Sequence, residues 1–153
     1  MALVRLIITL VLLCFCLSGC SGWPWRSSAS PKSNAYEIPK DVTTTELSVS
    51  RTAFKKRVAN EDLRNIRMVP VTRSVREDTG FPEYRLFSIS PESAYAMIGL
   101  EERDILIAAQ DYAVVDPSTF PIVVKLLENE SEARILIKRL GKMELVRTVF
   151  TDE

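Results

Sequence analysis

The sequence predicts an α+β fold: a small, partly open β-barrel or sandwich of about five strands with two helices, preceded by a short helix and a disordered tether. Residues 84–109 indicate a strand, a short helix and a strand, because runs rich in β-branched and aromatic residues flank an amphipathic turn that Gly99 closes. Residues 131–150 alternate apolar and polar positions around Gly141, as a hairpin with one wet face does. Residues 116–127 carry helical spacing between these two units.

Composition excludes several function classes. The 153 residues are enough for one domain with appendages, and 20 Lys and Arg balance 20 Asp and Glu, so no net field attracts nucleic acid. The chain has no histidine, which removes Ser-His-Asp and Cys-His catalysis and His-ligated zinc. Its carboxylates are scattered in turn-like places. We therefore expect no enzyme, no cofactor, no metal site, no small-molecule substrate and no nucleic-acid partner.

The first 19 residues have the features of a targeting segment. Arg5 supplies a positive charge, and an apolar run over 6–17 follows it. The run ends in Leu17-Ser18-Gly19-Cys20, which resembles the lipobox of bacterial lipoproteins. That resemblance implies cleavage before Cys20, a diacylglyceryl group on its thiol and, usually, acylation of the new amino terminus.

An uncleaved membrane anchor is the alternative to the lipoprotein signal. The apolar run over 3–19 is roughly 17 residues long, the lower limit for crossing a bilayer as a helix. The lipoprotein is favoured because an anchor does not need Ser-Gly-Cys at its exit. Either way, the body of the protein lies in the bacterial envelope, facing the periplasm. Ser21 leans weakly toward the outer membrane by resemblance, and the choice of membrane stays open.

Residues 20–46 are predicted to form the lipidated cysteine and a flexible tether. The segment mixes Ser, Pro and Thr with single charges and has no apolar periodicity, so it cannot bury enough surface to offset the entropy of ordering. Trp23 and Trp25 suit the membrane-water interface, or are incidental exposed aromatics.

Residues 47–65 are predicted to be a short helical lead-in. Ser50 can cap a helix in which Phe54 and Val58 form one apolar stripe. The basic run at 55–57 is a solvated face or, on a tethered domain, a membrane-facing patch.

The chain after this lead-in contains a short helical piece at 61–65 and then a strand whose Pro70 predicts a sheet edge. Farther on, Asp116 and Pro117 can open a helix. Pro121 must then fall within the first helical turn, so the regular helix begins later than Asp116 suggests.

The motif P-x-S-x-x-x-x-x-G-L-x-x-x-D-I-L resembles the middle of bacterial PDZ domains. The matching residues are Pro91, Ser93, Gly99, Leu100, Asp104, Ile105 and Leu106. With R-M-V-P-V at 67–71 and Y-R-L-F-S-I before the motif, the chain is similar to the periplasmic C-terminal region of the C component of type II secretion systems. This resemblance implies a PDZ-like domain over residues 66–153.

A PDZ fold implies a groove in which a partner segment adds to the sheet as an extra strand. We expect this groove between the helix that carries Ile122 and Leu126 and the strand at 84–89, with Tyr84, Leu86 and Ser88 on the strand side. Ile122 and Leu126 could equally pack under a loop or at a self-association contact.

Three departures from the PDZ pattern affect the expected ligand. Arg103 stands where glycine is usual, and Gln110-Asp111 replaces an Asn-Gly turn. Glu83 would place a negative charge beside a ligand's terminal carboxylate. Internal extended segments or a folded partner therefore become the expected ligands.

The functional prediction is a membrane-tethered protein-protein interaction module, a scaffold or adaptor within or beside a type II secretion apparatus. In that family the C component links the inner-membrane platform to the outer-membrane secretin. The runner-up is a PDZ adaptor lipoprotein for an envelope protease or chaperone. An enzyme comes a distant third.

Overall fold

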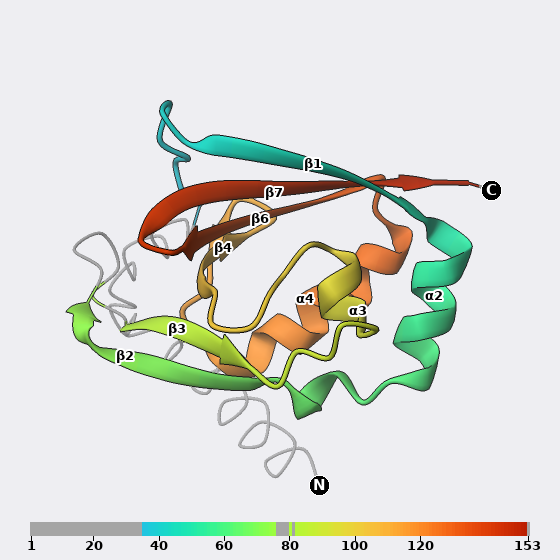
Figure 1. Cartoon of the computed structure of the whole chain (residues 1–153), viewed down its shortest axis with the longest axis horizontal. Helices are drawn as coiled ribbons and strands as arrows, with labels where there is room; N and C mark the ends of the chain where they lie inside the picture. The colour runs from blue at the N-terminus through green and yellow to red at the C-terminus, as the bar shows by residue number, and fades with distance from the viewer. Residues whose placement is uncertain (1–34, 76–79, 81, 153) are drawn as a thin grey trace, which may run out of the picture. The chain divides into compact units, whose positions relative to one another are not determined.

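The computed structural model describes residues 35–75, 80 and 82–152 (Figure 1). The predictions for the signal segment, for Cys20 and for Trp23 and Trp25 lie outside these residues. Within the described part of the chain, no helix is long and apolar enough to cross a bilayer.

The described residues contain a mixed sheet of seven strands in the order β1-β7-β6-β4-β3-β2, with β5 paired to β4. The strands are β1 Thr43–Ser50, β2 Arg67–Val75, β3 Pro82–Phe87, β4 Ile105–Ala109, β5 Tyr112–Ala113, β6 Glu132–Arg139 and β7 Lys142–Thr151. The pair β1–β7 is parallel, and the other pairs are antiparallel. The α+β class is confirmed, with two more strands than the sequence indicated, and β1 and β2 form the two edges.

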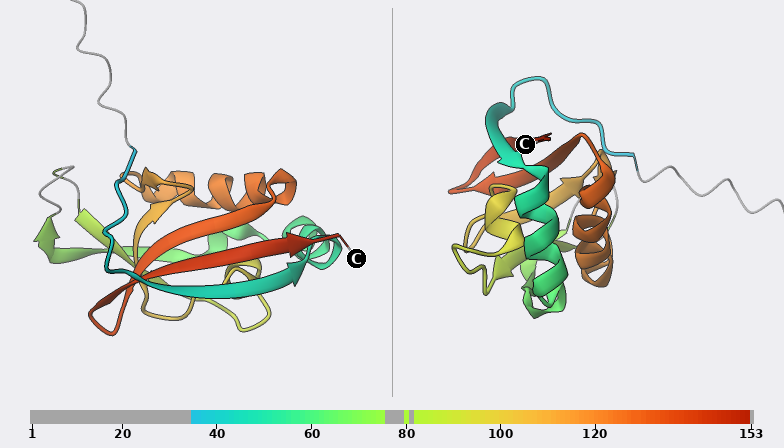
Figure 2. Two further views of the ribbon diagram at one scale, coloured as in Figure 1. Left: turned by 90° about the horizontal axis from the view of Figure 1, so that it is seen from above. Right: turned by 90° about the vertical axis from the view of Figure 1, so that its right-hand side faces the viewer.

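Three helices and three short 3-10 turns complete the described part of the fold. They are α2 Arg51–Asn60, α3 Ala94–Met97, α4 Phe120–Leu126, η1 Leu63–Asn65, η2 Pro117–Thr119 and η3 Leu127–Asn129. The sheet curls, so that β1, β6 and β7 face β2 and β3 across the core, with α3 and α4 between them and α2 at one end (Figures 1 and 2).

The helix starts follow the predicted caps. The backbone N–H of Ala53 donates to Ser50 Oγ at 3.3 Å, and Phe54 and Val58 are buried as expected. At the other helix, Asp116 caps η2, and α4 begins only at Phe120.

Pro121 consequently falls in the first turn of α4, where its missing N–H costs no hydrogen bond. The delayed helix start is confirmed.

The predicted boundary at residue 46/47 is wrong, because β1 crosses it. Thr43 to Ser50 pair in parallel with Glu144 to Thr151 of β7, which makes this stretch part of the sheet. The segment before β1 is also packed: Tyr36, Ile38 and Val42 lie against an apolar cluster on the outer face of the sheet. The tether prediction therefore fails for residues 35–46.

Gly99 ends α3 in the left-handed conformation, with φ +82°. A Cβ there would lie 2.5 Å from Leu47 Cδ1 and 2.6 Å from Val146 Cγ1, so β1 and β7 pack directly on this backbone. The turn positions Arg103, Gln110 and Asp111 also have positive φ, at 74°, 50° and 63°, which non-glycine residues adopt at a cost.

Candidate binding groove

The strand that the sequence suggested as the groove wall lies inside the sheet. β3 pairs with β2 through Leu86 and Met68, and with β4 through Tyr84 and Leu106. Leu86 is fully buried, and the Tyr84 hydroxyl donates to the Val115 carbonyl at 3.3 Å. The assignment of Tyr84 and Leu86 to the groove is wrong, because a strand with two neighbours has no free edge for a third.

Ser88 does not lie on the groove wall as expected, and Glu83 is not placed to repel a ligand's terminal carboxylate. Ser88 follows β3 in the left-handed region, with φ 65°, and its N–H donates to Glu102 Oε1 at 3.3 Å. Glu83 is 8% exposed and accepts two hydrogen bonds from Lys138 Nζ, at 2.9 and 3.1 Å. Since this ion pair lies within the sheet, Glu83 no longer argues against a ligand with a free carboxylate.

A groove of about 320 Å³ opens instead between the start of β2 and the start of α4. β2 is the last strand of the sheet, so no described strand lies beside its outer edge. The residues that line the groove are Arg64, Ile66, Met68, Pro117, Ser118 and Pro121. An extended chain laid in this groove would have backbone partners on β2 and apolar side chains opposite.

Two hydrogen-bonded carboxylates hold the rim of the groove. Ser118 donates to Asp116 Oδ1 from its hydroxyl at 2.8 Å and from its backbone N–H at 2.9 Å, which lowers the pKa of Asp116. The backbone N–H of Arg64 donates to Asp62 Oδ1 at 3.1 Å and its Nε does so at 3.2 Å, which lowers the pKa of Asp62. Both carboxylates therefore stay ionised and fix the turns that present Ser118 and Arg64.

Tyr95 of α3 contacts elements on both sides of the groove, η1 and α4. Its hydroxyl donates to the Leu63 carbonyl in η1 at 2.5 Å, and its ring lies 5.8 Å from the ring of Phe120 in α4. Burial, and then the charges of Glu61 and Asp62, raise the pKa of Tyr95. The hydroxyl thus links α3 to η1, and the ring of the same side chain contacts α4.

Ile122 and Leu126 do not line this groove. They are 60% and 59% exposed, while Phe120 and Val124 of the same helix are buried. At about 100° per residue, Pro121 and Leu126 fall on opposite flanks of the buried line. Their exposure excludes packing under a loop and leaves self-association as the open alternative.

One signal in the sequence pointed to the correct strand. Pro70 predicted that the strand around it lies at a sheet edge, and β2 is an edge. An added strand needs an edge, which β2 offers and β3 does not.

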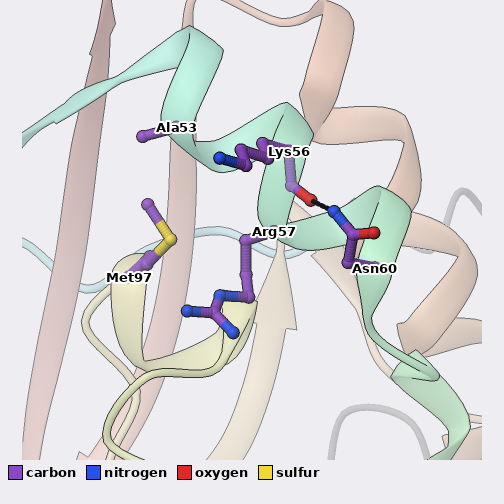
Figure 3. Close-up of a pocket in the computed structure, with 5 residues that line it drawn as sticks. All are labelled: Ala53, Lys56, Arg57, Asn60 and Met97. Atoms are coloured by element: carbon purple, nitrogen blue, oxygen red, sulfur yellow. Dashed lines mark hydrogen bonds between the residues drawn. The ribbon is translucent and has the colours of Figure 1, made fainter.

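A second depression, of about 370 Å³, lies between α2 and α3 (Figure 3). Ala53 and Met97 give it apolar walls, and Lys56 and Arg57 bring positive charge. The Asn60 side chain donates to the Lys56 carbonyl at 2.7 Å along the helix. Both elements are helices, so no backbone edge is available for a strand. The described residues contain no group of side chains that could hold a metal ion.

No protein-family model and no curated protein sequence matches this chain. Among solved structures, the chain is similar to the PDZ domain of EpsC from Vibrio cholerae. For residues 204–305 of that protein, the identity is 22%, with 65% of this chain and 90% of that chain covered, at a TM-score of 0.41. For its residues 219–305, the identity is 21%, with 59% and 99% covered, at a TM-score of 0.37.

Proposed function

We propose that this protein is a PDZ-type interaction module that binds an extended segment of a partner protein between β2 and α4. The observation that carries the proposal is the free edge of β2 beside a groove with apolar walls. Binding there forms backbone hydrogen bonds along β2, while alternate side chains of the ligand enter the space between Met68 and the two prolines. The module acts by binding and not by catalysis.

The proposed setting is the bacterial envelope. Cys20 carries the lipid and holds the module at a membrane, facing the periplasm; the lipobox-like sequence supports this. The resemblance of residues 66–153 to the C component favours a scaffold or adaptor role beside a type II secretion apparatus.

The charge at the groove refines the expected ligand. Arg64 lies at the rim, with its side chain 86% exposed, and Glu83 is neutralised elsewhere by Lys138. A terminal carboxylate is therefore acceptable beside Arg64, and an internal segment is acceptable along β2. Peptides that differ only in a free or amidated carboxyl end separate these two modes.

The test is capture of partners by the full-length protein after crosslinking in cells, with quantitative mass spectrometry. Ser118→Trp fills the groove, and Met68→Glu puts a charge on its wall; both should remove the partner. Leu126→Glu, on the other flank of α4, is the matched control and should retain it. Thermal melts followed by circular dichroism establish that each variant is folded.

The outcomes separate the parts of the proposal. Folded groove variants that keep the partner would overturn the groove, and loss with Leu126→Glu alone would point to the outer flank of α4. Secretin or platform proteins in the capture support the secretion role, whereas an envelope protease or chaperone supports the runner-up. An unmodified Cys20 in an uncleaved chain would contradict the lipid anchor.

A further inference from the structure

The outer face of the sheet is covered on one half and bare on the other. On β4, β6 and β7, the outward side chains Ile107 and Leu136 lie under the segment that carries Tyr36 and Ile38. No described segment packs in this way over the outer face of β2 and β3. The apolar surface of that hairpin is therefore open.

The strand register shows which residues occupy this open face. Arg85 is paired with Ile105, which belongs to the outer cluster, so Arg85 points outward too. Val69 is paired with Arg85, and Phe87, two residues along, is paired with Arg67. Cross-strand partners share a face, and alternate residues on a strand do so as well. Val69, Arg85, Phe87 and Arg67 therefore lie on one surface.

This surface is hollowed between its apolar side chains. A depression of about 200 Å³ is lined by Val69, Pro70, Val71, Arg85 and Phe87. The Arg67 guanidinium carbon lies 6.0 Å from the centroid of the Phe87 ring. The hollow is thus lined mainly by apolar side chains, with the positive charge of Arg85 beside them. The Arg67 guanidinium forms a cation–π contact with the Phe87 ring.

Arg67 and Arg85 lack described acidic partners, unlike most of the other arginines whose side chains the structure describes. Arg51, Arg139 and Arg147 bind carboxylates at 2.7 to 2.9 Å. No described carboxylate lies within 4.0 Å of the guanidinium groups of Arg67 and Arg85.

Arg103 adds a third positive charge at the end of the same hairpin. Its backbone N–H donates to the carbonyl of Leu86, the last residue but one of β3, at 2.9 Å, so its backbone lies beside the end of that strand. It is exposed, and no described carboxylate pairs with it. Arg85 therefore lines the hollow, Arg67 lies against its Phe87 ring, and the backbone of Arg103 lies near the end of the same strand.

We propose that this arginine face, made of Arg67, Arg85 and Arg103 around Val69, Val71 and Phe87, binds an acidic segment of a partner protein. Guanidinium groups form two-pronged hydrogen bonds with carboxylates, and unpaired ones carry no competing internal acid. An apolar side chain of the segment enters the hollow beside Phe87. The concave shape favours a protein segment over a membrane surface, since a bilayer is engaged by protruding apolar groups.

This site is separate from the groove between β2 and α4. Met68 faces the groove, whereas Val69 faces the hollow, so β2 presents its two sides to different ligands. The proposal goes beyond the proposed function and can fail or hold independently of it.

The test uses the full-length protein in detergent micelles and fluorescent probe peptides of about ten residues with alternating glutamate and valine. Matched probes carry glutamine or lysine in place of glutamate. Fluorescence anisotropy should show binding of the glutamate probe only, weakened by salt. The triple variant R67Q/R85Q/R103Q should weaken it at least tenfold, since one charge-assisted pair accounts for about that factor. Phe87→Ser should also weaken it.

Two controls distinguish this face from general charge and from the groove. K55Q/K56Q removes two exposed positive charges on α2 and should change the affinity less than twofold. Ser118→Trp blocks the groove and should leave the glutamate probe bound. Equal loss with K55Q/K56Q, no loss in the triple variant, or no binding of any probe would overturn the proposal. Arginine-dependent binding to phosphatidylglycerol vesicles without peptide binding would replace it with a membrane surface.

Discussion

The two edges of the sheet are built differently, and the difference separates support from binding. β1 packs Leu47 and Val49 on the core and is joined to β7 by an ion pair on its other face: Glu46 pairs with Arg147 of β7 at 2.9 Å, and Arg147 pairs with Glu132 of β6 at 2.8 Å. β2 has an apolar-walled groove on one side and an apolar hollow with unpaired arginines on the other. Glu46 of the β1 edge is paired with a described residue, whereas Arg67 and Arg85 have no described carboxylate partner, and this is the difference on which the two proposed binding sites rest.

The largest expected effect concerns the hydrogen-bond network around Asp104 and Arg139, which includes the carbonyl of Gly99, the residue packed under β1 and β7. Asp104 is 2% exposed and accepts hydrogen bonds from Arg139 at 2.7 and 2.9 Å and from the Glu101 N–H at 2.8 Å. Arg139 Nη2 also donates to the Gly99 carbonyl, and the bonds with Asp104 raise the pKa of Arg139. Asp104→Ala removes the most buried of the carboxylates paired with Arg139, leaves Glu101 and Glu144, and should lower the free energy of unfolding by about 3 kcal/mol in urea titrations.

Glu101→Gln is the control for Asp104→Ala. Glu101 lies 3.1 Å from Arg139 Nη1 but is 67% exposed, so its loss should cost less than about 1 kcal/mol. Equal effects of the two variants would contradict the special role of the buried carboxylate.

The next largest effect tests the contact between α3 and β1. Gly99→Ala adds a Cβ 2.5 Å from Leu47 Cδ1 at a residue with φ +82°. Overpacking and backbone strain together should cost about 2 to 3 kcal/mol. Leu47→Ala removes one of the two clashing side chains and leaves Val146, so the cost of the double variant should be smaller than the sum of the single ones. A fully additive thermal-melt result would exclude the clash with Leu47 as the cause.

A smaller effect should appear at the β2 side. Tyr95→Phe removes the donor to the Leu63 carbonyl and should cost about 1 to 2 kcal/mol of stability. Because this bond joins η1, which carries Arg64 of the groove, to α3, partner affinity should fall as well. A urea titration measures the loss of stability, and the yield of partner crosslinked to residue 68 measures the loss of affinity. Unchanged affinity would show that the groove does not depend on the hydrogen bond between Tyr95 and Leu63.

The smallest effect is expected at Glu46, the exposed end of the row of ion pairs formed by Glu46, Arg147 and Glu132. Glu46→Gln removes one of the two partners of Arg147, and Glu132 remains. Exposed ion pairs contribute little, so stability should not change within the error of a urea titration. A clear loss of stability would mean that the three charged residues stabilise the sheet as one unit.

Local features of this fold could be predicted, and long-range pairing could not. Ser50, Asp116 and Pro121 mark helix starts through contacts a few residues away, so the sequence alone was enough to place them. β1 was missed because Thr-Thr-Thr-Glu lacks an apolar period and gains its order from β7, at the far end of the chain.

The groove was misplaced for a similar reason. Leu86 and Tyr84 look the same in sequence whether they line a groove or fill a core, and only the strand order shows that β3 is interior. The arginine face was missed because Arg67, Arg85 and Arg103 are far apart in the chain and come together only through the sheet register and its turns.

The parallel pairing of β1 with β7 also affects the order of folding. Thr45 Oγ1 donates to Glu144 Oε1 across 99 positions of sequence, so the pair cannot form until nearly the whole chain is available. During synthesis, which runs from the amino end, β1 is complete before the strand with which it pairs. Non-local pairing of this kind slows folding and leaves an unpaired strand exposed in the meantime. Pairing of β1 therefore has to wait for β7, and a chain that ends before β7 lacks the strand with which β1 pairs.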